Sequence, residues 1–330
     1  MRCGLPFALV AVTALCCLPL PLLAGAASPA DWLQRMTASL HAESYQGTFV
    51  LQRDDRLDTI RVVHAADNGG YRERLETLTG SPREILRSVD RLSALKGARA
   101  DSGEGTGAPH WPAAAPVFLL EGHDRYVLED MGADRVAGLD CRMILARARD
   151  TLRYSHRYCL HAATALPLLS ELYDGHGNLL ERLAFTELER LDEVPDAALE
   201  PRRADVERIE VRADRGHEKL EWDDQTGMGG WGFSDLPDGF TAIAATERRV
   251  GDEGARQRHF VLSDGLASVS VYVESASGEQ MFEGTTRAGA THGAARSVDG
   301  HQVTAVGDVP RRTVQAVLDA VVYHRGESDD

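Results

Sequence analysis

Residues 257–275 read Gln-Arg-His-Phe-Val-Leu-Ser-Asp-Gly-Leu-Ala-Ser-Val-Ser-Val-Tyr-Val-Glu-Ser, and this stretch decides the fold of the last third of the chain. Its centre, Ser263-Asp264-Gly265, has turn chemistry, because Asp accepts hydrogen bonds from nearby backbone and Gly adopts positive φ at little cost. Beyond the turn, apolar residues at positions 267, 269, 271 and 273 alternate with residues 268, 270 and 272. The stretch therefore predicts a β-hairpin in an antiparallel sheet with one buried face.

The end of the chain predicts one more strand and a helix. Residues 300–310 have the pattern of a short strand, and a helix is expected from Thr313. Apolar residues at positions 314, 317, 318, 321 and 322 then lie on one stripe of that helix. The last third is thus expected to be a sheet covered by a terminal helix.

The first 27 residues have the pattern of a signal peptide. Arg2 gives the positive start, residues 5–23 are almost continuously apolar, and Ala24-Gly25-Ala26 supplies the small residues of a cleavage site. A retained membrane span is the less favoured alternative, because Pro19 and Pro21 interrupt the apolar run. The pattern predicts export to the periplasm with cleavage near Ala26 or Ala27.

The mature chain is acidic and long enough for two domains. Removal of the first 27 residues leaves about 300 residues, more than one ordinary core holds. Thirty-five basic residues then face 51 acidic ones, so nucleic acid, which requires clustered Lys and Arg, is not an expected partner. We expect a first domain at 28–190, an acidic linker without periodicity at 191–208, and a second domain at 209–326.

Two cysteines, Cys141 and Cys159, remain in the mature chain. In an oxidising compartment they predict one disulfide, and a turn centred on 149–151 would set them directly opposite each other on neighbouring strands. Such a bond would contribute about 3 kcal/mol to stability. The alternative is a zinc site with His161, which shares a strand face with Cys159 but brings no fourth ligand.

The first domain is expected to open with a helix after Ser28 and to continue as a series of antiparallel strands. The expected strands are 45–51, 59–64, 71–78, 83–89, 125–128, 135–149, 152–161, 166–173 and 179–188. Residues 97–116, rich in Gly, Ala and Pro, are interpreted as a surface loop, since the Lys of a phosphate-binding loop is missing. The fold class is therefore α+β.

Apolar side chains on the first strands have two interpretations. They are core residues, or some of them line a cavity for acyl chains, where each buried methylene contributes about 0.8 kcal/mol. The sequence does not divide the set between these two roles. Its members are Phe49, Leu51, Val62, Leu75, Leu78 and Ile85.

Four aromatic residues lie in and beside a glycine-rich stretch of the second domain: Trp222, Trp231, Phe233 and Phe240. Exposed aromatic side chains would anchor a partner, so Trp231, Phe233 and Phe240 are candidates for partner binding. The alternative is that these rings close the end of the second sheet. The chain has no Gly-x-Ser-x-Gly or His-Glu-x-x-His motif, so neither catalysis nor a cofactor or metal is expected.

Motifs in both domains resemble the RseB/MucB family. They comprise Trp32-Leu33-x-x-Met36, residues 45–49 (Tyr-Gln-Gly-Thr-Phe), residues 78–85, Arg153-Tyr154-Ser155-His156, Leu236-Pro237-Asp238-Gly239-Phe240, the hairpin quoted first, and Gly307-Asp308-Val309-Pro310. The chain departs from the family at His161 and Ala165, where an acid and a Gly are usual. The resemblance implies an N-terminal curved antiparallel sheet with helices, a half-barrel similar to the lipoprotein carrier LolA. It also implies a smaller C-terminal sheet domain.

The same resemblance implies a function. The family binds the periplasmic part of a membrane-spanning anti-sigma factor, protects it from proteolysis and so represses the envelope stress response. A lipid or lipoprotein sensed by the first domain would release the partner, which the second domain would contact. The alternative is a periplasmic carrier of lipids or lipoproteins; an exported hydrolase is disfavoured. The sequence leaves the oligomeric state open, a homo-oligomer included.

Overall fold

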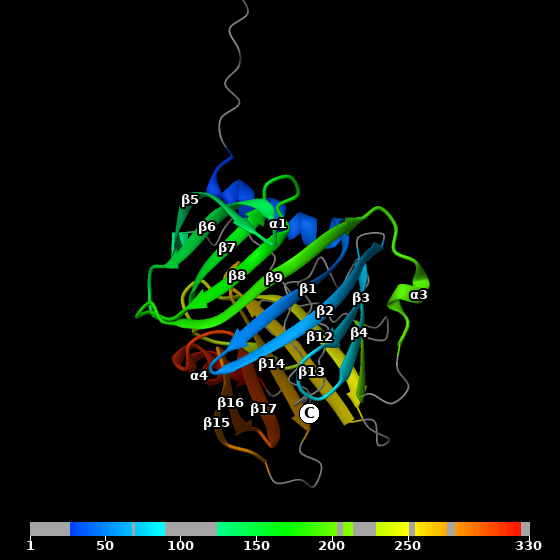
Figure 1. Ribbon diagram of the computed structural model, residues 1–330. Helices are drawn as coiled ribbons and strands as arrows, with labels where there is room; N and C mark the ends of the chain where they lie inside the picture. Colours follow the sequence, from blue (N-terminus) through cyan, green and yellow to red (C-terminus); the bar gives the residue numbers. More distant parts are fainter. Residues whose placement is uncertain are drawn as a thin grey trace, which may run out of the picture.

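The chain folds into two β-rich domains (Figure 1). The computed structural model describes residues 27–67, 70–89, 124–202, 207–213, 229–250, 255–275 and 281–324. The predicted signal peptide up to residue 26, the predicted loop at 97–116 and Trp222 lie outside these ranges. Within them, no helix is long and apolar enough to span a membrane.

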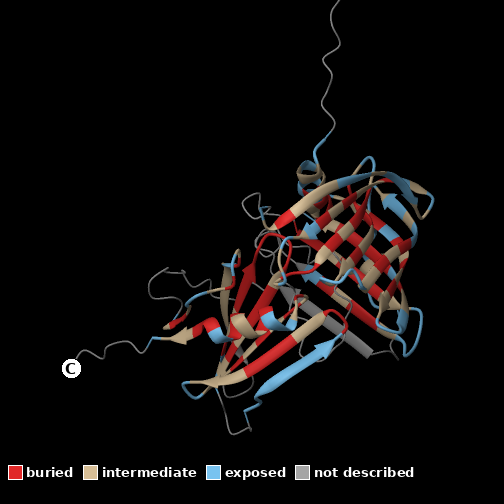
Figure 2. Cartoon of the chain, turned by 90° about the vertical axis from the view of Figure 1, so that its left-hand side faces the viewer, coloured by how far each residue is buried: buried red, intermediate tan, exposed pale blue. Residues whose placement is uncertain are grey.

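The first domain is built on a ten-stranded sheet. In spatial order its strands are β10 (Glu207–Ala213), β4 (Arg83–Val89), β3 (Gly70–Thr77), β2 (Arg56–Asp67), β1 (Ser44–Arg53), β9 (Leu179–Leu191), β8 (Pro167–Tyr173), β7 (Ser155–His161), β6 (Leu139–Ala148) and β5 (Tyr126–Val136). All neighbours are antiparallel except β10 and β4. Buried and less buried positions alternate along its strands (Figure 2), as expected for a sheet with one covered face. The large curved antiparallel sheet predicted from the sequence is confirmed.

Helix α1 (Pro29–Ala42) packs against one face of this sheet. It begins where Ser28 and Asp31 cap each other: the Ser28 hydroxyl accepts a hydrogen bond from the Asp31 amide, and the Asp31 carboxylate accepts one from the Ser28 amide at 2.8 Å. Its buried side chains, Leu33, Met36 and Leu40, join the apolar cluster of the sheet. The predicted docked helix is therefore present.

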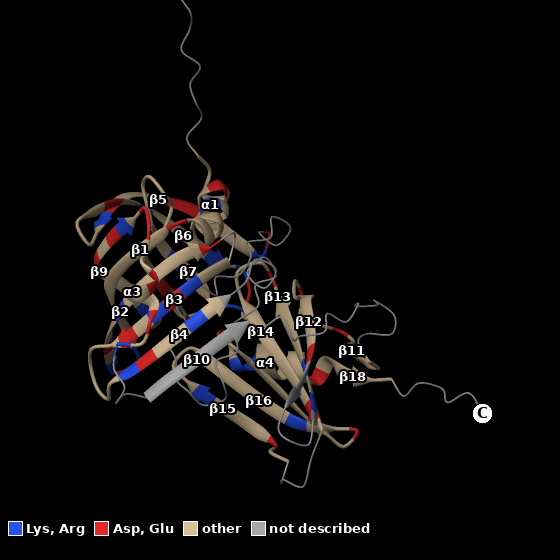
Figure 3. Cartoon of the chain, turned by 90° about the vertical axis from the view of Figure 1, so that its right-hand side faces the viewer, with Lys and Arg blue, Asp and Glu red and all other residues tan. Residues whose placement is uncertain are grey.

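The segment expected to be a linker contains regular structure. Strand β9 extends to Leu191, and a short helix, α3 (Asp196–Leu199), follows it. Strand β10 then pairs in parallel with β4 at the edge of the large sheet (Figure 3). The expected boundary at residue 209 thus falls inside a strand of the first sheet. Sequence periodicity missed β10 because its pairing partner is more than a hundred residues away in the chain.

The second domain has a six-stranded antiparallel sheet. Its strands, in spatial order, are β12 (Thr241–Val250), β13 (Ala255–Ser263), β14 (Ser268–Ser275), β17 (His301–Gly307), β16 (Thr291–Val298) and β15 (Gly284–Ala288). A two-stranded sheet joins β11 (Trp231–Phe233) to β18 (Val321–Tyr323). Helix α4 (Arg311–Ala320) covers the six-stranded sheet with Val314, Val317 and Leu318. The predicted smaller sheet with a terminal helix is confirmed, but the helix ends at Ala320, and Val321 and Val322, which were expected on it, lie in β18.

The hairpin at 257–275 forms as β13 and β14, with Ser263 paired to Ser268. Gly265 has φ +101°, a conformation that favours glycine, and the Leu266 and Ala267 amides donate hydrogen bonds to Asp264 Oδ1 at 2.9 and 2.7 Å. Asp264 and Gly265 therefore have the turn roles expected from the sequence.

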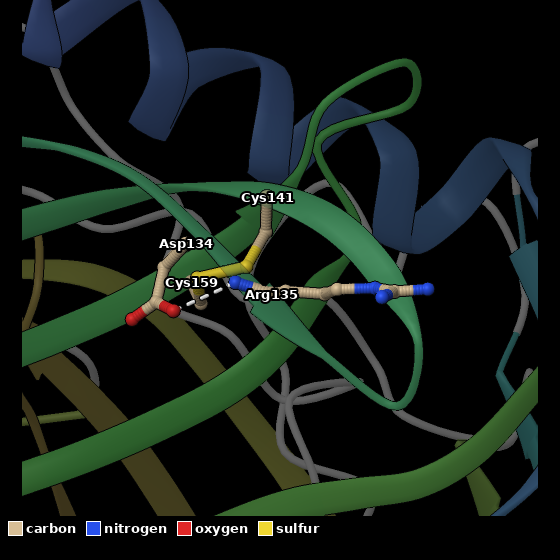
Figure 4. The surroundings of a disulfide bond; sticks show 4 residues. All are labelled: Asp134, Arg135, Cys141 and Cys159. Atoms are coloured by element: carbon tan, nitrogen blue, oxygen red, sulfur yellow. Dashed lines mark hydrogen bonds between the residues drawn. A yellow bond between two sulfur atoms is a disulfide. The ribbon is translucent and has the colours of Figure 1, made fainter.

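The disulfide between Cys141 and Cys159 is formed, with Cα atoms 5.5 Å apart (Figure 4). The expected register was wrong by two residues: Cys141 is paired with His161, and Cys159 with Met143, so the bond runs diagonally between β6 and β7. The six-residue connection 149–154 shifts the register, because it is longer than the turn expected around 149–151. Both sulfurs are bonded to each other, which removes them as thiolate ligands of zinc.

Candidate functional site

The inner face of the large sheet is the first part of the candidate site. Five of the six apolar residues singled out from the sequence lie in one cluster with the buried side of α1. They are Phe49, Leu51, Val62, Leu75 and Ile85, each at most 2% exposed. Leu78 lies apart from them and is 42% exposed, because β3 ends at Thr77.

A buried polar group interrupts this apolar face. Glu73 accepts a hydrogen bond from Arg87 Nη1 at 3.0 Å, and its other oxygen is 3.3 Å from His64 Nδ1. Burial is the largest influence on the pKa of Glu73 and raises it, but His64 and Arg87 together hold that pKa below its ordinary value. The rings of Tyr45 and Tyr71 stack on the His64 ring. The face therefore combines aliphatic surface with a compensated charge cluster.

The second part of the site is the junction between the domains, which is centred on Arg153. Arg153 lies in the connection between β6 and β7, and its Nη1 donates a hydrogen bond to Asp264 Oδ2 at 2.8 Å. The Tyr126 hydroxyl donates to the same oxygen at 3.0 Å. The side chains of Arg153 and Asp264 are both 0% exposed. The tip of the second domain's hairpin is thus held by two donors of the first domain.

The carboxylate of Asp264 is divided between the two domains. Oδ1 accepts hydrogen bonds from two backbone amides of its own hairpin, whereas Oδ2 accepts hydrogen bonds from the side chains of Arg153 and Tyr126. Burial raises the pKa of Asp264 above its ordinary value, although the Leu266 amide and Arg153 favour the charged form. The junction is therefore a costly place for a carboxylate unless its partners stay in position.

A second turn of the small domain contacts the same arginine. Arg153 Nη2 donates to the Asp238 carbonyl oxygen at 2.6 Å, and its guanidinium carbon lies 5.4 Å from the centre of the Phe240 ring. The Asp238 carboxylate pairs with Arg125. Residues 236–240 and the hairpin tip, two motifs of the family resemblance, thus both contact the first domain at Arg153.

The start of α4 completes the junction. Thr313 donates its hydroxyl to the Leu152 carbonyl oxygen at 2.5 Å, and Arg312 Nη1 donates to Thr151 Oγ1 at 2.8 Å. Tyr154 adds a contact to β16, with its hydroxyl 3.4 Å from His292 Nδ1. Within the described ranges, the connection between β6 and β7 is therefore hydrogen-bonded to residues 236–240, 263–267, 292 and 312–313 of the second domain.

One residue of the second domain belongs to the core of the first. Leu266, 3% exposed, clusters with the inner-face residues of the large sheet and with α1, whereas its neighbour Ala267 belongs to the core of the second domain. The hairpin tip thus presents the Asp264 carboxylate and the Leu266 side chain, two residues apart in the chain, to the first domain.

The three aromatic candidates for partner binding lie in or beside the core of the second domain. Trp231 is 1% exposed, and its ring contacts the rings of His301 and Tyr323. Phe233 packs edge-on against Phe260, and Phe240 faces Arg153. These positions agree with the alternative that the rings close the second sheet, and partner contact by Trp231, Phe233 and Phe240 stays a prediction.

Arg153, Asp264 and Tyr126 were not singled out as site residues from the sequence. Asp264 was interpreted as a turn residue, which accounts for only one of its two oxygens. The available indication was that its hairpin and residues 153–156 both match the family, although a motif match does not tell which segments meet. Within the described ranges, no three His, Cys, Asp or Glu residues are grouped so that they could hold a metal ion.

The fold and the site define a class: a two-domain α+β protein in which a hairpin of the small domain is buried against the covered face of a large curved sheet. The MucB/RseB N-terminal domain family matches residues 28–203, and the MucB/RseB C-terminal domain family matches residues 225–322. The chain belongs to the MucB/RseB family.

Characterised relatives cover nearly the whole chain. The sigma factor AlgU regulatory protein MucB of Pseudomonas aeruginosa is 30% identical over 299 residues, which are 88% of this chain and 90% of the relative. The sigma-E factor regulatory protein RseB of Haemophilus influenzae is 24% identical over 88% of this chain and 90% of its own length.

Solved structures of MucB have the same architecture. A crystal structure of MucB in complex with MucA(peri) superposes with a TM-score of 0.62 at 26% identity, over 90% of this chain and all of that chain. The Pseudomonas aeruginosa MucA/MucB complex gives a TM-score of 0.62 at 27% identity, over 90% and 99% of the two chains.

Proposed function

We propose that this chain is a periplasmic regulator that binds the periplasmic part of a transmembrane anti-sigma factor, protects it from proteolysis and so represses the envelope stress response. One observation carries the proposal: both domains match relatives named as sigma factor regulatory proteins, including MucB, which has been solved in complex with MucA(peri). The match extends across the hairpin and the connection 149–154, so it includes the junction between the domains.

Action by binding, without catalysis, is part of this proposal. Both mature thiols are bonded to each other, and the buried Glu73 and Asp264 are engaged by arginines. Such pairs fix an arrangement of segments, which is what a binding surface requires.

The proposal divides the work between the domains. The first domain, whose sheet includes β10 and so extends to Ala213, would sense a lipid or lipoprotein through the inner face of that sheet. The second domain, described from residue 229 onward, would contact the anti-sigma factor. Export with cleavage near Ala26 or Ala27 belongs to the same proposal. For the lipid to release the partner, it must bind the free protein more tightly than the complex, because a ligand shifts an equilibrium only through such a difference.

The decisive experiment measures protection. The mature protein is mixed with the periplasmic part of the candidate anti-sigma factor, with and without lipid, and cleavage of that partner is followed over time. Slow cleavage that lipid accelerates is the expected result. Cleavage at the same rate with and without the protein would refute the regulatory role, and stoichiometric lipid transfer without protection would identify a carrier instead.

A truncation tests the division between the domains. Because β10 pairs with β4, the first domain is expressed as residues 28–213 so that the large sheet keeps its edge strand. This fragment should bind lipid but give no protection. Full protection by the fragment would show that the second domain is not the site of partner contact.

A further inference from the structure

The hairpin tip 263–267 occupies the first domain as a bound ligand would. Leu266 places an aliphatic side chain in the inner-face cluster, and Asp264 places a carboxylate oxygen on Arg153 and Tyr126. The two groups are joined through a turn that the hairpin stabilises by its own amides. The conformation of the tip is therefore held by hydrogen bonds within the hairpin itself.

The part of the first domain that the tip contacts, here called the seat, consists of Arg153, Tyr126 and the inner-face cluster. Its chemistry follows from these contacts. An aliphatic surface lies beside a guanidinium whose side chain has no exposure to solvent and a tyrosine hydroxyl, both of which donate to one anionic oxygen. Asp150 Oδ1 accepts from the other side of Arg153, at Nε, with a distance of 3.1 Å. Nη1 and the Tyr126 hydroxyl are then the donors that become available when the hairpin withdraws.

We propose that the seat of the hairpin tip is a binding site for an anionic amphiphile, and that the ligand and the tip exclude each other. The anionic group would replace the Asp264 carboxylate on Arg153 and Tyr126, and the chain would replace Leu266 in the apolar cluster. This inference rests on the proposed lipid sensing and names its ligand class and its regulation. Withdrawal of the tip breaks a contact between the domains, so ligand binding at the seat changes how the domains are joined.

Binding is measured with full-length mature protein and a fluorescent fatty acid, 11-(dansylamino)undecanoic acid, with its methyl ester as the neutral match. The double variant Asp264→Asn, Leu266→Ala weakens the tip and leaves both donors in place. It should bind the acid at least roughly fivefold more tightly than the wild type, with a smaller change for the ester. Arg153→Gln in that background should reduce acid affinity to that of the ester. Asp130→Asn, at an ion pair with Arg142 on the edge hairpin, is the matched control and should bind like the wild type.

Hydrogen exchange tests the exclusion without any substitution. Addition of the acid to the wild type should accelerate exchange of residues 263–267, because the seated tip is displaced. Binding of the acid with unchanged exchange there would overturn the proposal, as would equal affinities in the wild type and the double variant. Inorganic phosphate at millimolar concentration should not displace the acid from the protein. Complete displacement would show that the seat binds anions in general, and this result would overturn the proposal of an amphiphile site.

The protection assay separates this inference from the proposed function. If the wild type protects the partner but neither it nor the double variant binds the acid, the amphiphile site is refuted and the proposed partner binding still stands. Absence of protection by the wild type would instead remove the proposed function.

Discussion

Arg153 Nη1 and Asp264 Oδ2 lie 2.8 Å apart between the two domains, and neither side chain is exposed to solvent. Without Asp264, Arg153 would keep only the partly exposed Asp150 as an ionic partner among the described residues. Removal of one member of a buried pair commonly costs about 3–5 kcal/mol. The pair therefore links the stability of one domain to that of the other.

Asp264→Ala should uncouple the domains. The wild type should unfold in one transition, whereas the variant should show two, with the docked arrangement weakened by about 3–5 kcal/mol because Arg153 loses its principal acceptor. Calorimetry and urea unfolding followed by both Trp fluorescence and circular dichroism measure this. Asp130→Ala, which breaks an ion pair on the edge hairpin β5–β6, should keep one transition. Coincident single transitions in the Asp264 variant would contradict the coupling.

His156 should make the protein less stable at acid pH. Burial lowers the pKa of His156 from 6.5 to about 4, with an opposing influence from Asp308, and the Tyr158 hydroxyl lies 3.0 Å from its Nδ1. Below pH 6.5 His156 becomes protonated in the unfolded chain, whereas in the folded protein it stays neutral until the pH falls to about 4. Stability should thus fall as pH decreases through this window, by roughly 3 kcal/mol in total.

His156→Gln isolates this contribution. Urea unfolding at several values between pH 7 and pH 4 should show a shallower loss of stability in the variant than in the wild type, because the titrating group is gone. His176→Gln changes a residue at the exposed turn between β8 and β9 and should reproduce the wild-type profile. Parallel profiles for the wild type and His156→Gln would contradict the prediction.

Leu75 and Leu78 form a matched pair for the inner face of the large sheet. Leu75 is 1% exposed and Leu78 is 42% exposed, although they lie three residues apart. Leu75→Ala should cost about 2–5 kcal/mol, because it leaves a cavity in the core, whereas Leu78→Ala should change stability by less than about 1 kcal/mol. Guanidinium unfolding measures both. Equal costs would place Leu78 in the core.

The strands and turns of this protein were largely predictable because they follow local patterns. The β4 bounds agree with the sequence prediction, and the Ser263-Asp264-Gly265 turn lies where its chemistry placed it. The pairing of β10 with β4 was not predictable, since it depends on a contact between distant segments. The same reason hid the second role of Asp264: an acid in a turn has the same sequence pattern whether its free oxygen faces water or a buried arginine.

The register of β6 and β7 shows how a correct pair can follow from a wrong alignment. The sequence predicted directly opposed cysteines, but the connection 149–154 contacts the second domain, where Arg153 donates a hydrogen bond to Asp264. The register is shifted by two residues and the bond becomes diagonal, yet the 5.5 Å between the Cα atoms still suits a disulfide.

The disulfide should contribute to stability through the 18-residue separation that it closes. Cys141→Ala, Cys159→Ala and the double variant should each lose about 3 kcal/mol, since either substitution alone opens the loop in the unfolded chain. Guanidinium unfolding, performed with reductant for the single variants, should give them the same midpoint as the double variant. Unfolding of the wild type in reductant should approach that midpoint, because the bond is then opened in the unfolded state. A double variant as stable as the oxidised wild type would mean that the packing of β6 against β7 holds this part of the sheet without the bond.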